Sequence, residues 1–402
     1  MSNDSSTPPS TGALAGIRIV DLTRILAGPF CTQHLADHGA DVVKVEPPVG
    51  DETRTWGPPF KDGQSAYFSG VNRNKRSLGL DLASERGREV LFRLLATADV
   101  VVENFKAGTL EKWGIGFDDV LAPRFPSLIH CRISGYGSTG PYGGLPGYDA
   151  IAQAMSGLMS INGEANGEPV RVGAPMADLA AGMHALSAIL MALIERQRSG
   201  RGQSVEICLL DAAISLLHPH AANYLMSGKR PKRTGNAHPN IAPYELFPTA
   251  NGMLFLAIGN DRQFGRLMAE LGSPETAEDS RFRTNADRLT NRPALTGTLC
   301  TLLADKDGTA LSFQLLKAGV PAGVVQEIPE VLEHPQVRHQ KMGVEIDGYR
   351  GLGVAVKMSR TPGAARTKPP FLGEHSRIVL GEAGLAVGEI EDLIAAGVVV
   401  AR

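Results

Sequence analysis

The first half of the sequence predicts an α/β fold built on a parallel sheet. Short β-branched runs alternate with amphipathic stretches of helical spacing, and the runs are apolar on both faces, as in sheets covered by helices on either side. Strands are expected at residues 17–22, 42–45, 100–103, 128–133 and 205–209. Helices are expected at residues 30–38, 86–96 and 176–198. Sheets of this kind bind ligands at the carboxyl ends of their strands, so a site is expected there.

The second half predicts a separate, smaller unit. A chain of 402 residues is too long for one ordinary hydrophobic core, and its texture changes after residue 217. A linker is expected at 218–243, because most of this stretch is basic, contains glycine and proline, and lacks periodicity. Residues 244–330 combine a strand pair with three helical patterns, which predicts an α+β domain. Residues 331–402 hold a further strand-rich piece and a last short helix.

Composition and charge exclude two classes of partner. The chain is 43% hydrophobic and 20% charged, with a formal net charge of −2, so it has no electrostatic footprint for nucleic acid. The longest apolar run, residues 185–194, is about half the roughly 18 to 20 residues that a membrane span needs. We expect neither a nucleic-acid nor a membrane partner.

The first residues and the cysteines indicate the compartment. Residues 1–13 are polar and free of Lys and Arg, which predicts a disordered tail rather than a signal or transit peptide. The cysteines Cys31, Cys131, Cys208 and Cys300 stand far apart among apolar residues, which argues against a zinc site and a disulfide scaffold. We therefore expect a cytoplasmic protein with buried thiols and no metal.

Two motifs suggest other chemistry but lack the context it needs. Residues 135–140 match G-x-G-x-x-G after a strand, yet glycines and prolines at 141–147 prevent the helix that would bind a dinucleotide pyrophosphate. We interpret this stretch as a flexible glycine-rich cover over a site. His218 and His220 have no carboxylate or cysteine at ligand spacing, so a helix end with two histidines is the better interpretation.

Asp178 is the informative acid. Every other residue from 174 to 183 is apolar or glycine, and Pro175 suits the first turn of a helix. A lone carboxylate among apolar neighbours is costly unless it is stabilised, and a helix N-terminus favours its ionised form by roughly 0.3–1 kcal/mol. Two interpretations are open at this point: a reactive carboxylate, or a capping aspartate with no chemistry.

Cations are placed where a polyphosphate would need them. Residues 72–76 offer three cations and two amides in five positions, and Lys106 and Lys112 follow the strand that ends near Asn104. A solvated basic loop would give the same pattern.

Together these segments resemble the class III CoA-transferase family, which includes formyl-CoA:oxalate and carnitine CoA-transferases and the α-methylacyl-CoA racemases. The resemblance runs from about residue 14 to the C-terminus. It is carried, in family order, by 16–48 (GIRIVDLTRILAGPFCTQHLADHGADVVKVEPP), 72–82 (NRNKRSLGLDL), 98–108 (ADVVVENFKAG), 133–142 (ISGYGSTGPY), the Asp178 segment and 200–212 (GRGQSVEICLLDA).

The resemblance implies a fold and a chemistry. The fold is a Rossmann-like large domain, formed by residues 14–217 and 331–402, with the smaller domain inserted and two chains interlocked as a homodimer. The chemistry makes Asp178 the covalent nucleophile. CoA and acyl-CoA are substrates beside a small carboxylic acid, and no cofactor is held permanently. The family's CoA contacts correspond to Leu26, Ala27, Leu80, Asn104, Phe105, Lys106, Lys112, Tyr148 and Asp149.

Departures from the family pattern bear on the substrate. Formyl-CoA transferases carry four glycines in a loop where this chain has residues 234–243 (TGNAHPNIAP). An oxalate-specific role is therefore not expected, and the C-terminal half looks closer to relatives that act on succinate-type dicarboxylic acids.

Two other functions remain as alternatives. Racemases of the family place a histidine at the position of Tyr148 and a glutamate at that of Gly259. A tyrosine with an ordinary pKa of about 10 is a poor base at neutral pH, which favours the transferase. A non-catalytic acyl-CoA binding protein is the third possibility, and the presence of Asp178 argues against it.

Overall fold

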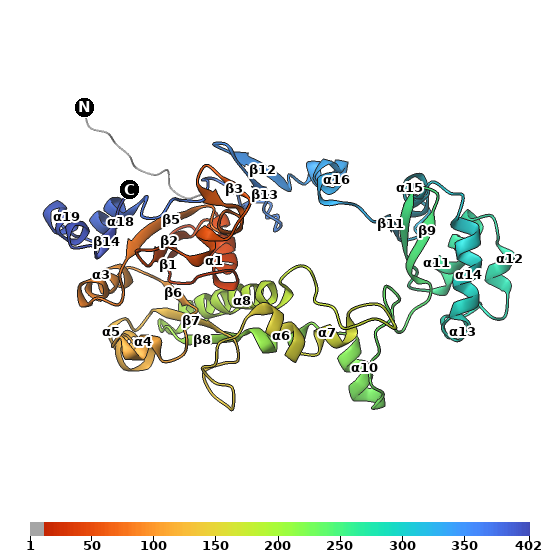
Figure 1. Ribbon diagram of the computed structural model, residues 1–402, viewed down its shortest axis with the longest axis horizontal. Coiled ribbons are helices and arrows are strands. Elements are labelled where there is room, and N and C mark those ends of the chain that lie inside the picture. Colours follow the sequence, from red (N-terminus) through yellow and green to blue (C-terminus); the bar gives the residue numbers. More distant parts are fainter. Residues whose placement is uncertain (1–11) are drawn as a thin grey trace. The chain divides into compact units, whose positions relative to one another are not determined.

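The computed structural model describes residues 12–402, which form two compact units (Figure 1). The first unit comprises the described chain up to Leu158, together with Val172–Leu216 and Pro335–Arg402. The second unit comprises Met159–Arg171 and Leu217–His334, and is therefore an insertion into the first. Residues 1–11 of the predicted disordered tail lie outside the described residues.

The first unit is built on a seven-stranded sheet, in which β14 (Val399–Val400), the last strand along the chain, is antiparallel to its neighbour and the other six strands are parallel. In spatial order the strands are β14, β5 (Lys75–Leu80), β2 (Asp41–Glu46), β1 (Arg18–Asp21), β6 (Val100–Glu103), β7 (Ile129–Ser134) and β8 (Ser204–Cys208). Counted along the chain, the six parallel strands have the order 3-2-1-4-5-6 of a doubly wound, Rossmann-like fold. The order reverses between β1 and β6, and such a switch point is where these folds bind ligands.

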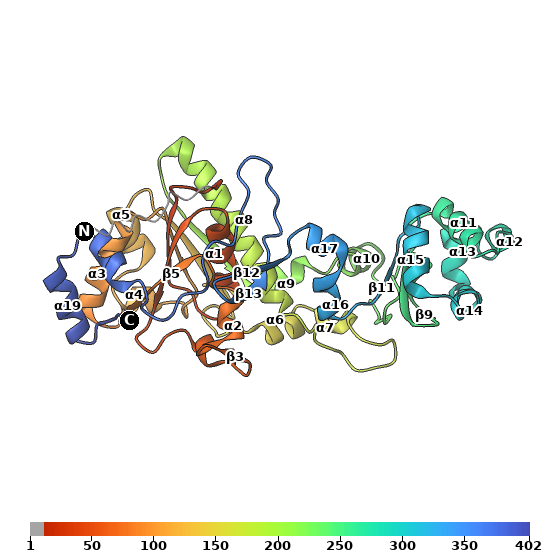
Figure 2. The same cartoon turned by 90° about the horizontal axis from the view of Figure 1, so that it is seen from above.

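Helices cover both faces of this sheet because successive strand residues point to opposite sides. Ile19 and Val42 pack against one helical layer, and Val20 and Val43 against the other. The first layer consists of α1 (Ala27–Asp37), α8 (Met176–Ser199) and α9 (Leu209–Ser215). The second consists of α3 (Glu85–Leu95), α18 (Ser376–Glu382) and α19 (Val387–Ala395). Figure 2 shows the long α8 beside α1.

Local signals set the ends of these helices. The Ser84 hydroxyl accepts a hydrogen bond from the Gly87 amide and so caps α3. Gly200 ends α8 with φ at 71°, a left-handed conformation that glycine adopts without steric cost. Among residues 12–402, α8 is the one helix long and apolar enough to cross a membrane, and one of its faces packs into the core of the first unit.

Short elements complete the first unit. They are η1 (Glu52–Thr55), β3 (Phe60–Lys61), β4 (Gln64–Ser65), α2 (Ala66–Ser69), α4 (Thr109–Lys112), η2 (Phe117–Leu121), α5 (Ala122–Arg124), α6 (Asp149–Met155), α17 (Pro335–His339), β12 (Gly343–Ile346) and β13 (Tyr349–Leu352). α7 (Leu158–Ile161) lies where the chain first leaves this unit.

The second unit has its own core beneath a three-stranded antiparallel sheet. The strands are β11 (Ala322–Val324), β10 (Gly252–Ala257) and β9 (Tyr244–Thr249), in that spatial order. The helices are α10 (His220–Ser227), α11 (Asp261–Glu270), α12 (Glu275–Glu278), α13 (Asn285–Thr290), α14 (Arg292–Leu303), α15 (Gly308–Lys317) and α16 (Ile328–Glu333). α10 lies within the predicted linker 218–243, so part of that segment is helical.

A second boundary also differs from the prediction. Met159–Arg171, expected in the large domain, belongs to the second unit. Its backbone is bonded to residues much later in the chain: the Gly235 amide donates to the Gly163 carbonyl at 3.1 Å, and the Arg233 guanidinium donates to the Gly167 carbonyl at 2.6 Å. Pairing across 66 or more residues leaves no trace in local periodicity, so the sequence pattern could not reveal it.

Candidate active site

The loops after β1 and β6 meet at the switch point of the sheet. The Arg24 amide donates to the Asn104 side-chain oxygen at 2.9 Å, and the Asn104 side-chain NH2 donates back to the Arg24 carbonyl at 2.8 Å. The Arg24 guanidinium also lies 5.9 Å from the centre of the Phe105 ring. The structure therefore brings the predicted CoA contacts after β6 next to those that open α1.

Three of the predicted contacts can use only their backbone. The side chains of Leu26, Ala27 and Leu80 are buried in the core, with residue exposures of 7%, 3% and 1%. Leu26 precedes α1 and makes no side-chain cap to it, so the first amides of α1 have no side-chain acceptor. Such amides, at the positive end of a helix dipole, suit a phosphate or a carbonyl oxygen of a ligand.

The other predicted contacts differ in exposure, and Asn104 and Phe105 are half-buried. Lys106 and Lys112 are exposed beside this edge and make no ion pair within residues 12–402, so both can meet a phosphate. Tyr148 is 58% exposed at the start of α6. Asp149 is buried.

Asp149 caps the helix that carries Asp178. One of its carboxylate oxygens accepts from the Ala177 amide at 2.8 Å and from the Asp178 amide at 3.4 Å. The other accepts from the Gln153 side chain at 2.8 Å. The carboxylate of Asp149, predicted as a CoA contact, is therefore committed to holding the start of α8.

Asp178 lies in the first turn of α8 with its carboxylate unpaired. Within residues 12–402 this carboxylate makes no hydrogen bond or ion pair, and Asp149 already fills the capping role that was the alternative interpretation. Burial, and then the negative charge of Asp149, raise the pKa of Asp178 from 3.8 to about 7. A shift of this size, caused by desolvation and a like charge, is typical of catalytic carboxylates.

An aromatic pair near Asp178 was missed by the sequence analysis. The rings of Trp56 and Tyr67 meet edge-on at 5.0 Å and are partly exposed. Burial, together with the charges of Asp178, Asp149 and Asp51, raises the pKa of Tyr67, which places its phenol within electrostatic reach of Asp178. No spacing in the sequence joins residues 56 and 67 to residue 178, so only the fold could reveal this pair.

The basic cluster at 72–76 is structural, so its interpretation as a phosphate site is wrong. Arg73 pairs with Asp37 at 2.6 Å, Lys75 with Asp21 at 3.1 Å, and Arg76 with Asp41 at 2.6 Å. Lys75 is also fully buried. These cations join β5 to neighbouring elements through ion pairs, because a buried charge needs a partner.

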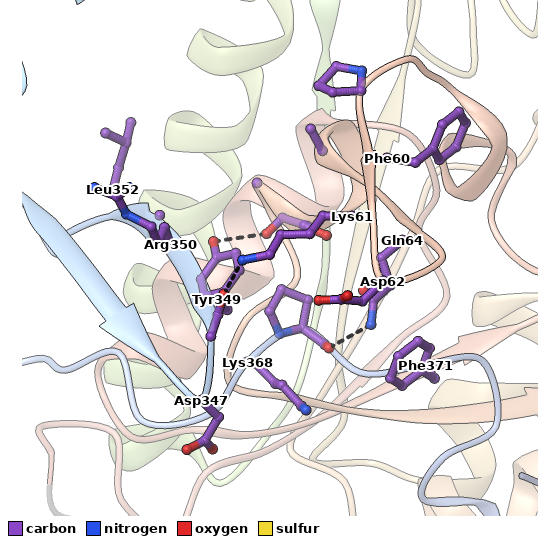
Figure 3. Close-up of a pocket in the computed structure, with 17 residues that line it drawn as sticks. Phe60, Lys61, Asp62, Gln64, Asp347, Tyr349, Arg350, Leu352, Lys368 and Phe371 are labelled. Atoms are coloured by element: carbon purple, nitrogen blue, oxygen red, sulfur yellow. Dashed lines mark hydrogen bonds between the residues drawn. The ribbon is translucent and has the colours of Figure 1, made fainter. Parts of the chain in front are cut away.

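A cavity of about 600 Å³ lies elsewhere in the first unit (Figure 3). Its wall joins the β3–β4 hairpin to the β12–β13 hairpin, where the Lys61 ammonium donates to the Gly348 carbonyl at 2.7 Å and the Tyr349 hydroxyl to the Ser69 carbonyl at 3.0 Å. None of the predicted site residues lines it. Residues 12–402 contain no group of three or more His, Cys, Asp or Glu side chains arranged to hold a metal ion.

Comparisons with known proteins show the family of this chain. A family model described as CoA-transferase family III matches residues 14–376. The chain belongs to CoA-transferase family III. It is therefore an enzyme of this class, and CoA thioesters are its substrates.

Relatives with named activities cover nearly the whole chain. A succinate–glutarate CoA-transferase of Agrobacterium fabrum is 44% identical over 381 residues, which are 92% of this chain and 95% of that protein. Succinyl-CoA:glutarate CoA-transferase of Homo sapiens is 40% identical over 398 residues, which are 96% of this chain and 90% of that protein. A solved CaiB/BaiF family protein from Brucella suis has a TM-score of 0.84 and 44% identity, and the match covers 93% of this chain and all of that one.

Proposed function

We propose that this enzyme transfers CoA from a dicarboxylic acyl-CoA such as succinyl-CoA to a second dicarboxylic acid, with Asp178 as the nucleophile. The unpaired, half-buried carboxylate of Asp178 in the first turn of α8 is the observation that carries the proposal. CoA would lie along the switch point, with its phosphates near Lys106 and Lys112 and its thioester at the start of α8. The dicarboxylate preference is supported by the names of the relatives, which act on succinate and glutarate.

The reaction exchanges one acyl partner for another without water. The Asp178 carboxylate attacks the thioester carbonyl, the C–S bond breaks, and the CoA thiolate leaves an acyl-aspartyl anhydride. The thiolate then attacks the Asp178 carbonyl, which releases the donor acid and forms an aspartyl-CoA thioester. The acceptor carboxylate attacks the carbonyl of this thioester, the C–S bond breaks, and the CoA thiolate leaves an anhydride between Asp178 and the acceptor acid. A final attack by the thiolate on the acceptor carbonyl gives the new acyl-CoA and free Asp178.

An aspartate suits this sequence for a physical reason. An anhydride is about as reactive as a thioester, so little free energy is trapped in the intermediate, whereas a serine ester would be too stable to return the acyl group. The raised pKa of Asp178 also makes its anion a better nucleophile than an ordinary carboxylate, since nucleophilicity increases with basicity. In the glycine-rich stretch 135–144 the amides of Gly137, Gly143 and Gly144 donate to neighbouring residues. The amides of residues 138–140 are the candidate donors to the oxyanion.

A donor–acceptor screen tests the proposed function. Succinyl-CoA with glutarate is expected to give glutaryl-CoA and succinate in equal amounts with no free thiol, and acetyl-, formyl- and oxalyl-CoA are expected to be poorer donors. Stoichiometric free CoA without a new thioester would indicate a hydrolase. Rapid α-deuterium incorporation into (R)-2-methylacyl-CoA in heavy water, without CoA exchange, would favour the racemase.

We also infer a homodimer, and its support lies on the outer face of α8. Met183, Met191 and Ile194 point away from the core with exposures of 43%, 64% and 59%, an apolar stripe that a second copy would cover. Light scattering is expected to give about twice 42.6 kDa even at nanomolar concentration. A particle of 42.6 kDa would contradict the homodimer, and sedimentation with lipid vesicles would instead assign the stripe to a membrane. The cytoplasmic location stays a prediction.

A further inference from the structure

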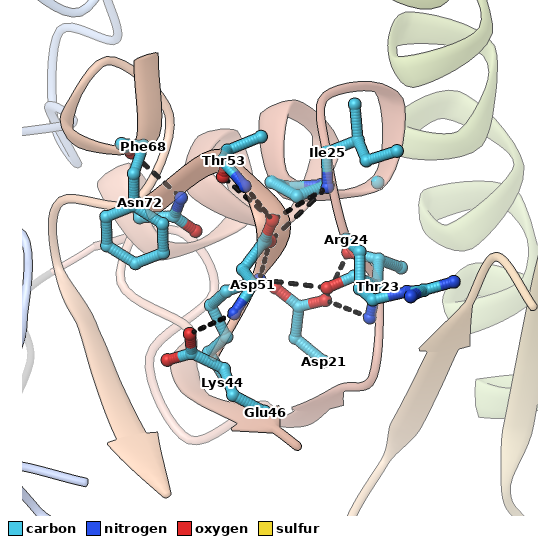
Figure 4. Close-up of polar contacts among 12 residues, drawn as sticks. Asp21, Thr23, Arg24, Ile25, Lys44, Glu46, Asp51, Thr53, Phe68 and Asn72 are labelled. Carbon is cyan, nitrogen blue, oxygen red and sulfur yellow. Dashed lines mark hydrogen bonds and ion pairs between the residues drawn. The ribbon is translucent and has the colours of Figure 1, made fainter. Parts of the chain in front are cut away.

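The turn between β1 and α1 is held by buried side chains from another strand and loop (Figure 4). The Lys44 ammonium, on β2, donates to the Thr23 carbonyl at 2.8 Å. The Ile25 amide donates to the two carboxylate oxygens of Asp51 at 3.3 and 3.4 Å. With the Arg24–Asn104 exchange described above, the backbone polar groups of three consecutive residues are fixed by side chains at the switch point.

Ile25 has a left-handed backbone conformation, which is sterically unfavourable for its β-branched side chain. Its φ is 72°, in the left-handed region, where a β-branched residue is a rare outlier. Such a residue stays there only when surrounding contacts force it, and such outliers cluster at ligand sites. Asp51 supplies the bond to the Ile25 amide, and the residue that follows Ile25 is Leu26, at the start of α1.

Asp51 is built as a permanent buried anion. The side chains of Asp51 and Lys44 are fully buried and 3.0 Å apart, and the Thr53 amide and hydroxyl donate to Asp51 at 3.0 and 2.8 Å. Burial opposes ionisation, but the charge of Lys44 and the bonds from Thr53 outweigh it and lower the pKa of Asp51 to about 2. No step of the transfer reaction uses this pair.

We propose that Asp51, together with Lys44, is a positioning residue for CoA. It holds Ile25 in the left-handed conformation and thereby sets the amides of Leu26 and Ala27 in the orientation that binds acyl-CoA. The inference rests on the proposed CoA site at the switch point. It adds a pair of residues that affects the affinity for CoA without contacting CoA or Asp178.

The first test is Asp51→Asn, which keeps the shape but removes the anion. The substitution turns one of the two oxygens that accept from the Ile25 amide into an NH2 donor and removes the counter-charge of Lys44, so the restraint on the turn is weakened. The KM for succinyl-CoA and the Kd for free CoA are therefore expected to rise about tenfold, while kcat changes less than about threefold. Unchanged KM and Kd would overturn the proposal.

The decisive test is a rescue at position 25. Glycine adopts a positive φ without cost, so Ile25→Gly removes the need for an external restraint on this turn. Asp51→Asn combined with Ile25→Gly is expected to bring the Kd for CoA back to within about threefold of Ile25→Gly alone. A double variant as weak as Asp51→Asn would show that Asp51 acts by another route.

Matched variants separate positioning from stability. Asp37→Asn breaks a buried ion pair with Arg73 at the other end of α1, so it should lower the Tm but leave the KM for succinyl-CoA unchanged. If Asp51→Asn does not fold, Thr53→Val removes one bond to Asp51 and is expected to raise that KM about threefold. A Thr53→Val variant with the wild-type KM would then overturn the proposal.

Hydrogen exchange distinguishes failure of this inference from failure of the proposed CoA site. Free CoA is expected to protect the amides of residues 23–27 in the wild-type protein, and less so in Asp51→Asn. If CoA protects other segments but not this one, the proposed site is wrong. If CoA protects this segment equally in both proteins, the site stands and the positioning role of Asp51 is refuted.

Discussion

Asp178→Ala is expected to lower kcat for CoA transfer by three or more orders of magnitude, a loss on the scale measured for other covalent nucleophiles. The Asp178 carboxylate must form both the acyl anhydride and the CoA thioester, and the neighbouring carboxylate of Asp149 cannot replace it, since Asp149 is bonded to the amides of α8. The Kd for CoA should change little, because the proposed nucleotide contacts lie at Leu26, Asn104 and Lys112.

Asp178→Asn sharpens this test. The amide keeps the shape but lacks the anionic oxygen, so it is expected to be nearly as inactive as alanine. Hydroxylamine added to the wild-type enzyme during turnover should leave a hydroxamate on the peptide that contains Asp178, and a mass spectrum would locate it. High activity in Asp178→Asn, or an adduct on another peptide, would return Asp178 to a structural role.

Most strands of the large sheet could be predicted because each is a short run of apolar, β-branched residues that is visible in the local sequence. The strands expected near residues 17–22, 100–103 and 205–209 correspond to β1, β6 and β8. β5 was not predicted as a strand, because it begins with Lys75 and Arg76, and two adjacent cations are more typical of an exposed loop than of a buried strand. β14 was also missed, since two residues give no periodicity and its place is set by pairing with β5, more than 300 residues earlier.

In the candidate site, too, the features visible in the local sequence could be predicted and those set by distant contacts could not. Asp178 could be singled out from the sequence as the one acid at an apolar helix start, but that segment left a capping role open, and the family resemblance then implied its role as nucleophile. The sequence could not show which of the two acids, Asp149 or Asp178, caps α8. Asp149 accepts from the Ala177 amide, which lies 28 residues later in the chain, and local spacing does not reveal such a contact. The cluster at 72–76 misled for a related reason: its counter-charges Asp21, Asp37 and Asp41 come from distant elements, so the sequence showed the cations without their partners.

The environment that raises the pKa of Asp178 has a second consequence, for stability. In the unfolded chain its carboxyl titrates near 3.8, and in the folded protein near 7. Between these values the folded state holds the extra proton, so this group's contribution to stability is full below about pH 4 and is lost as the pH rises through 7. At pH 8 the folded protein must keep an unpaired anion that is half-buried. One pKa unit corresponds to about 1.4 kcal/mol, and residual contact with water reduces the total.

Asp178→Asn is therefore expected to stabilise the protein while it abolishes activity. The gain in free energy of unfolding should be near zero at pH 4 and grow to about 2 kcal/mol at pH 8, because an amide does not pay for burial of a charge. Urea unfolding at both pH values measures it. Asp149→Asn keeps an acceptor for the Ala177 amide but removes the like charge, so in that background the gain should be smaller but not absent, since burial is the larger cause. A gain independent of pH, or a less stable variant at pH 8, would show that the Asp178 carboxylate is not held in an unfavourable ionised state.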